Sequence, residues 1–258
     1  MSQNLLKKLD ESDPIYQAMG PDIQRFRAGH TYTLLSAVSV LGYVPRDTLT
    51  GKVLDFGCDT GGCTYVLVSN GADITAVDLN GKSIDQLVAT GILPQEKALA
   101  VDGIEYMSKQ PDESYDLVTA FMLDPSFGKN RSLFYAFWNE AKRIIKPNGR
   151  IIIQSDAGTI SEVSDILGSE VDRVLPSTEY FCLVGYKGNP PTERQTTRSF
   201  EEGILTFSEE ETLTPAFITP KKSVAPYGIF MEFGTHFDLS KIPKEYILNM
   251  CLALGNSK

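Results

Sequence analysis

The sequence predicts an α/β fold in which a mostly parallel sheet is covered by helices on both faces. Short apolar runs alternate with segments of helical periodicity from residue 51 onward, which is typical of repeated β-α-β units. The first of these runs is apolar at consecutive positions, as expected of a strand that is buried on both sides. A chain of 258 residues with 42% hydrophobic residues is long enough and apolar enough for such a core.

The first predicted strand, residues 52–56, contains an aspartate and leads into a glycine-rich turn. Gly57 and Gly61 let the backbone turn sharply and come close to a ligand. A helix predicted over residues 63–70 would direct its unpaired N–H groups at that ligand. The spacing G-x-x-x-G-G differs from the G-x-G-x-x-G of nicotinamide and flavin sites. The fixed negative charge of Asp55 favours a cationic ligand over a pyrophosphate.

This segment resembles the first motif of the class I S-adenosylmethionine-dependent methyltransferases, acid-x-Gly-x-Gly-x-Gly. Asp55, Gly57 and Gly61 match the motif, and Asp59 stands where its middle glycine usually lies. The resemblance implies that S-adenosylmethionine binds here and leaves as S-adenosylhomocysteine. It also implies a Rossmann-like three-layer sandwich with a seven-stranded, mostly parallel sheet whose last strand is antiparallel.

Two further strands are each followed or ended by an acid. Residues 72–78 form a predicted strand ending in Asp78, to which the resemblance assigns the ribose hydroxyls; a turn or helix-capping role is the alternative. Residues 97–101 form the third predicted strand. The resemblance places Asp102, followed by Gly103, at the adenine amino group, and helix capping is again the alternative.

The remaining landmarks follow in the order of the same family. A fourth strand is predicted over 115–121, a helix over 131–145, and a fifth strand over 150–154 after the helix-breaking residues 146–149. An antiparallel strand over 180–187 would complete the sheet. The predicted cofactor-binding residues are Asp55, Gly57, Cys58, Asp59, Gly61, Asp78, Leu79, Asp102, Gly103 and Phe121.

The sequence suggests three parts. Residues 1–50 form an N-terminal helical segment that either covers the cofactor or simply packs on the sheet. Residues 51–187 form the methyltransferase core. Residues 188–258 form a β-rich extension with a final helix over 243–254, which would cap the substrate pocket, shield a sheet edge or make a homodimer.

The charge balance favours a small-molecule methyl acceptor, with an oxygen, nitrogen or carbon atom as nucleophile. The chain has 24 basic against 33 acidic residues, and a net charge of -9 is unfavourable for binding nucleic acid. Two alternatives remain. Residues 124–127, Asp-Pro-Ser-Phe, resemble the Asp-Pro-Pro-Phe tetrad of amino-methylating enzymes, some of which act on macromolecules. A binding or scaffold protein that keeps the fold without catalysis is the other.

An acceptor that loses a proton needs a base, and histidine is the residue best suited to neutral pH. The candidates are His30 and His236, the only histidines in the sequence; otherwise the base is Asp124, Asp156, a tyrosine or absent. No metal site is predicted, because Ala157 follows Asp156 where catechol-type methyltransferases have an Asp-Asn pair.

The sequence also predicts the compartment. No apolar run is long enough to span a bilayer, and the first eight residues are too polar for a secretory signal, so we expect a cytoplasmic protein that does not enter membranes. Cys58, Cys63, Cys182 and Cys251 lack the spacing of zinc or redox motifs. We expect them to be reduced packing residues.

Overall fold

The computed structural model describes residues 6–21, 23–40, 43–122, 127, 130–156, 163, 167, 171–176 and 180–187. The N-terminal elements are α1 (Pro14–Ala18), the π-helix η2 (Ile23–Ala28), α2 (Gly29–Val40) and α3 (Arg46–Leu49). The strands are β1 (Lys52–Phe56), β2 (Asp73–Asp78), β3 (Ala98–Ala100), β4 (Tyr115–Ala120), β5 (Ile145–Asp156), β6 (Val171–Pro176) and β7 (Tyr180–Tyr186). Between them lie α4 (Gly62–Ser69), α5 (Gly81–Ala89), the 3₁₀-helix η3 (Gln95–Lys97), α6 (Gly103–Ser108) and α8 (Arg131–Ile144).

The seven strands form one sheet in the order β3-β2-β1-β4-β5-β7-β6. The first five strands in this order pair in parallel, and β7 is antiparallel to both β5 and β6. The order reverses between β1 and β4, because the chain leaves β1 in one direction and later returns to its other side. The predicted α/β class, with a seven-stranded mostly parallel sheet and an antiparallel last strand, is confirmed.

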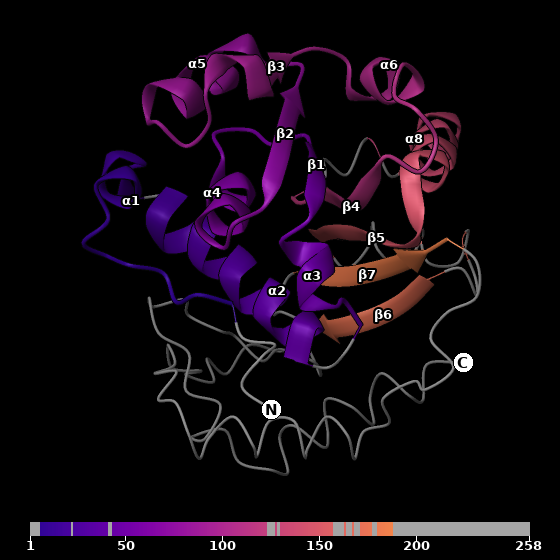
Figure 1. Ribbon diagram of the computed structural model, residues 1–258, viewed down its shortest axis with the longest axis horizontal. Helices are drawn as coiled ribbons and strands as arrows, with labels where there is room; N and C mark the ends of the chain where they lie inside the picture. Colours follow the sequence, from indigo (N-terminus) through magenta and orange to yellow (C-terminus); the bar gives the residue numbers. More distant parts are fainter. Residues whose placement is uncertain are drawn as a thin grey trace, which may run out of the picture.

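Neighbouring residues along each central strand enter opposite hydrophobic cores. Val53 packs with the helices on one face and Leu54 with those on the other, and Leu117 and Val118 divide in the same way. Figure 1 shows α1, α2 and α4 on one side of the sheet and α6 and α8 on the other, which makes three layers. The consecutive apolar residues in the sequence therefore reflect burial on both faces.

The fifth strand begins earlier than its sequence suggests. We expected residues 146–149 to separate the helix from a strand at Arg150, but β5 starts at Ile145, immediately after α8. Tyr115 of β4 pairs with Ile145 and Leu117 pairs with Arg150, so the intervening residues of β5 bulge out of the ladder. A proline without an N–H group is tolerated in such a bulge. The sequence also did not locate β6.

The N-terminal segment shares a hydrophobic core with the sheet. Leu35 and Val38 of α2 are fully buried in the same cluster as Val53 of β1 and Ile74 of β2. Packing on the sheet is thus established for this segment, while covering a cofactor stays a prediction. The boundaries at residues 50 and 187 also stay predictions, and residues 188–258 lie outside the described part of the chain. Of the helices in the described ranges, none has the length and apolarity needed to cross a bilayer.

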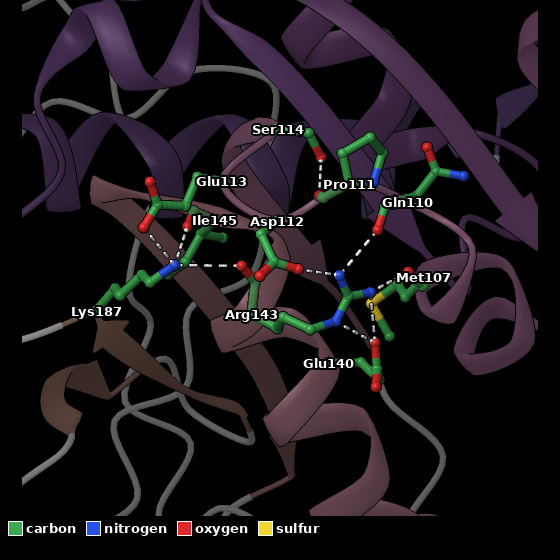
Figure 2. Close-up of polar contacts among 10 residues, drawn as sticks. All are labelled: Met107, Gln110, Pro111, Asp112, Glu113, Ser114, Glu140, Arg143, Ile145 and Lys187. Carbon is green, nitrogen blue, oxygen red and sulfur yellow. Dashed lines mark hydrogen bonds and ion pairs between the residues drawn. The ribbon is translucent and has the colours of Figure 1, made fainter.

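A polar network ties the C-terminal end of α8 to the loop before β4 (Figure 2). Arg143 donates from Nη1 to Asp112 Oδ1 at 2.6 Å and to the Gln110 carbonyl at 2.8 Å. Its Nη2 donates to the Met107 carbonyl and to Glu140 Oε2, both at 2.7 Å. One guanidinium therefore satisfies two backbone carbonyls and two carboxylates.

Lys187, just after β7, extends this network. Its Nζ donates to the Arg143 carbonyl at 3.2 Å and the Ile145 carbonyl at 3.1 Å, and it pairs with Glu113 Oε1 at 3.1 Å. A cation at the C-terminal end of a helix also interacts favourably with the helix dipole. The network thereby joins β7 to the helix layer formed by α6 and α8.

We predict that Arg143→Ala lowers the free energy of unfolding by about 2 kcal/mol, because it removes the donor of the Gln110 carbonyl and the ionic partner of Glu140, and takes a second donor from the Met107 carbonyl. Urea unfolding measures the change. Lys109→Ala is the control: its ion pair with Glu105 is exposed, with side-chain exposures of 67% and 66%, and should contribute less than about 1 kcal/mol. Equal losses in the two variants would contradict a special role for Arg143.

Candidate functional site

The glycine-rich turn lies at the carboxyl end of β1, beside the point where the strand order reverses. Gly57, Asp59 and Gly61 have positive φ angles of 68°, 46° and 95°. The N–H groups of Gly57 and Cys58 both donate to the Val77 carbonyl, at 2.9 and 3.2 Å. The turn is therefore held against the end of β2. Crevices at such reversal points are the usual ligand sites of open α/β sheets.

Asp55 is buried beneath this turn, with 1% of its surface exposed. Its Oδ2 accepts from Thr64 Oγ1 of α4 at 2.6 Å, and its Oδ1 accepts from Thr119 Oγ1 of β4 at 2.8 Å. Burial raises the pKa of this carboxyl to about 6, although the two hydroxyl donors oppose the rise. The side chain thus joins three elements around the turn, and its observed contacts are all internal to the protein.

Asp59, the residue at the family's middle glycine, connects the turn to two other segments. Its Oδ2 pairs with Arg27 Nη1 of η2, and its Oδ1 accepts from Ser83 Oγ of α5 at 2.8 Å. Arg27 Nη1 also donates to Thr60 Oγ1 at 3.1 Å. A Cβ on Gly62 would lie 2.6 Å from the Arg27 Cβ, so the close approach of η2 requires a glycine there.

Asp78 lies at the end of β2 and faces the turn. Its Oδ2 accepts from the Asp59 N–H at 2.9 Å and its Oδ1 from the Asn80 N–H at 2.7 Å. The N-cap of α5 is Asn80 and not Asp78, so of the two alternative roles the turn aspartate is confirmed and the helix cap is wrong. A carboxylate can accept about four hydrogen bonds, which leaves capacity for hydroxyl donors of a ligand. Leu79 beside it is 76% exposed.

Asp102 is the N-cap of α6, as the alternative interpretation had it. Its Oδ1 accepts from the N–H groups of Ile104 at 2.8 Å and Glu105 at 3.0 Å. Gly103 is buried against Phe56, whose ring a Cβ at this position would overlap. These contacts explain both residues without a ligand. Contact of Asp102 with adenine stays a prediction.

The other predicted site residues fall into two groups. Cys58 and Phe121 are buried, with 5% and 8% exposure, and burial raises the pKa of the Cys58 thiol far above its usual range. His236 and Asp124 lie outside the described residues, and only the backbone of Asp156 is described. No cluster of three or more potential metal-ligating side chains occurs within the described ranges.

The structure argues against His30 as a base at neutral pH. The imidazole is 4% exposed, and burial lowers its pKa to about 4. A base this weak is poorly matched to proton removal near pH 7. Its Nε2 also lies 3.3 Å from the amide nitrogen of Gln154, inside the protein. His30 was a reasonable candidate from the sequence because burial cannot be read from a single histidine in an amphipathic segment.

Sequence reasoning missed several residues of the site. Arg27 and Ser83 hold Asp59, Thr64 and Thr119 hold Asp55, and Gln154 lies next to His30. One signal was available: Asp59 stands where the motif usually has glycine, and an aspartate in such a turn needs hydrogen-bond partners, so donors should have been sought for it.

Comparisons with known proteins identify a methyltransferase domain and a similar fold. Residues 54–153 match a family model described as a methyltransferase domain. A 98-residue stretch, 36% of this chain, is 32% identical to a ribosomal RNA large subunit methyltransferase M from Marinomonas sp. (strain MWYL1), and it covers 26% of that protein. The fold is similar to that of human methyltransferase-like protein 13, solved in complex with SAH, with a TM-score of 0.50 and 15% identity over 68% of this chain and 88% of that one.

We predict that Asp55→Asn removes a pH-dependent component of stability. Because the pKa in the folded state is raised from 3.8 to about 6, the folded protein binds a proton that the unfolded chain has already lost within this window. Stability from this group is full below about pH 4 and is lost as pH rises through about 6. Relative to the variant, the wild type should lose roughly 3 kcal/mol across the window.

Urea unfolding at pH 4 and pH 7 measures this difference. Asp85→Asn, which alters an exposed carboxylate of α5, is the control and should follow the wild-type curve. Parallel curves for wild type and Asp55→Asn would show that the buried carboxyl does not titrate as described.

Proposed function

We propose that this chain, which carries a methyltransferase domain of the class I S-adenosylmethionine-dependent type, transfers the methyl group of S-adenosylmethionine to a small-molecule acceptor. The cofactor would lie at the carboxyl ends of β1 and β2. The observation that carries this placement is the arrangement of Asp59, Asp78 and Leu79 around one turn.

The residues around the turn suit an adenosyl ligand. Asp78 has acceptor capacity for the ribose hydroxyls while it holds the turn through its two present bonds. Leu79 offers an exposed apolar side chain to one face of a flat base. Gly57, at positive φ and with open space where a Cβ would lie, leaves the backbone bare where the ligand would come closest. At Gly61 a Cβ would instead crowd Leu87 and Ile92, so this glycine serves the packing beneath the turn.

When bound, S-adenosylmethionine supplies an electrophilic methyl carbon on a sulfonium, which an acceptor nucleophile takes by in-line displacement. The residues of the chain align the partners and exclude water, which can reduce the barrier by several kcal/mol, up to about 7 to 11 in model systems. Asp55, Asp59 and Asp78 surround the turn with negative potential that favours a cation, and Arg27 offsets part of it. If the methyl acceptor loses a proton, His236, Asp124, Asp156 or a tyrosine would take it; otherwise the reaction needs no protein base.

The net charge of -9 supports a small-molecule acceptor, because nucleic-acid binding needs an excess of basic residues. A second candidate function is methylation of a macromolecule. The similarity to an rRNA methyltransferase supports it, and this similarity extends over 26% of that protein.

We also propose a cytoplasmic location, which fits the free, buried thiols of Cys58, Cys63 and Cys182. Analytical ultracentrifugation would measure whether the chain forms a homodimer in solution.

Transfer of a tritiated methyl group distinguishes the candidates. The purified chain is incubated with labelled S-adenosylmethionine and, separately, with a small-metabolite extract or with ribosomal RNA. Label in the metabolite fraction supports the proposal, and label only in RNA supports the second candidate. Binding of S-adenosylmethionine without transfer to either, or absence of binding, would contradict both methyltransferase candidates and support a non-catalytic binding or scaffold protein.

We predict that Asp78→Asn weakens S-adenosylmethionine binding at least tenfold, because the charged acceptor for the ribose hydroxyls is lost. Isothermal titration calorimetry measures the Kd. Asp73→Asn makes the same change at the other end of β2, where the carboxylate pairs with Lys97, and should leave the Kd within about twofold. An unchanged Kd in Asp78→Asn would remove the ribose assignment.

A further inference from the structure

The residue that follows β4 by two positions has an unusual backbone. Met122 has a φ of +53°, in the left-handed region that residues with a Cβ seldom adopt. Its side chain is 39% exposed, although it is large and apolar. Such a conformation persists only where the surroundings hold it in place.

A buried amide holds this backbone. Gln154 of β5 is fully buried, and its Oε1 accepts from the Met122 N–H at 2.8 Å. We call this hydrogen bond between Gln154 and Met122 the clamp. Strands β4 and β5 are directly paired, with Ala120 opposite Ile153, so the clamp lies just beyond the last residue pair of their ladder. The bond therefore sets the direction in which the chain leaves β4.

The same amide contacts the N-terminal helix layer. Because Oε1 accepts from an N–H, the amide nitrogen of Gln154 must be the atom that faces His30 Nε2, 3.3 Å away. That nitrogen can only donate, so a hydrogen bond between the two side chains requires an unprotonated Nε2. The low pKa of about 4 keeps the imidazole neutral and able to accept at neutral pH. Gln154 thus links α2 to the segment after β4.

The position of the clamp relative to the reversal in strand order indicates its role. The sheet order reverses between β1 and β4, so the segment after β4 borders the crevice on the side opposite the glycine-rich turn. If the cofactor occupies the β1 and β2 side, the acceptor must approach from the β4 and β5 side. Met122, which is exposed and whose N–H is held by Gln154, follows β4 on that side.

We propose that Gln154 is a positioning residue for methyl transfer, which holds Met122 in a left-handed conformation so that the methionine side chain contacts the acceptor. This inference rests on the proposed methyltransferase function. It adds a contact residue, Met122, and the buried Gln154–His30 pair that fixes it.

The first test uses Gln154→Met, which keeps an unbranched chain of similar length and removes both hydrogen bonds. We expect the Met122 amide to exchange with solvent at least tenfold faster by NMR. We also expect kcat/KM to fall at least tenfold for the acceptor found in the labelled-methyl screen. The Kd for S-adenosylmethionine should change less than threefold, because the residues around the glycine-rich turn are untouched.

The second test uses Met122→Gly, which keeps the proposal testable if Gln154→Met does not fold. Glycine adopts a positive φ without a steric penalty, so the melting temperature should be no lower than that of the wild type. Loss of the side chain should nevertheless lower kcat/KM at least fivefold. A purely structural role predicts no such loss.

The outcomes separate this inference from the function on which it rests. Failure of wild-type S-adenosylmethionine binding would contradict the proposed function, while the exchange rate of the Met122 amide still reports on the clamp. If S-adenosylmethionine binds, unchanged exchange in Gln154→Met overturns the clamp. Unchanged kcat/KM in Met122→Gly overturns the contact with the acceptor.

Discussion

The buried carboxylate of Asp55 is the interaction on which the arrangement of the site depends. It lies where β1 ends, and the two hydroxyls that it accepts come from α4 and from β4. One side chain of β1 therefore joins the helix that follows this strand to the strand that neighbours it across the reversal in strand order. Keeping a carboxyl in an apolar interior is unfavourable unless its oxygens are satisfied, and the two threonines satisfy one oxygen each.

Asp59 shows how the chain accommodates a side chain where relatives of this fold usually have glycine. A left-handed φ is tolerated by aspartate when local hydrogen bonds compensate for the strain. Here the carboxylate is held by Arg27 and Ser83, and the backbone N–H is held by Asp78. The substitution therefore brings the N-terminal segment and α5 to the turn. An exposed ion pair contributes little alone, and the geometry depends on all three contacts together.

The sequence predicted the elements whose signals are local. Strand β1 was placed at its observed bounds because Val53, Leu54 and Phe56 form a mainly apolar run that ends in a glycine turn. Helix α8 was placed within one residue because its apolar positions recur at helical spacing, although Leu133 proved to be 37% exposed. The start of β5 was misplaced, because its bulge depends on pairing with β4 and not on residues 146–149 themselves.

Within the site, the sequence predicted the loop and the order of the acidic residues but not what those residues contact. The partners of Asp55 and Asp59 come from segments up to 64 positions away, and no pattern around the aspartates identifies them. The burial that makes His30 a weak base is likewise a tertiary property. Asp102 shows the converse case, since its capping role follows directly from its position before a helix and was foreseen as an alternative.

The shared core of the N-terminal segment and the sheet restricts how ligands enter and leave. Leu35 and Val38 have no exposed surface, and withdrawing each from the core would be unfavourable by about 1.5 to 3 kcal/mol. Movement of α2 away from the sheet would therefore have to overcome this loss of burial. If the cofactor binds at the glycine-rich turn as proposed, the exposed Leu79 side chain and the Arg27–Asp59 ion pair can move at far lower cost.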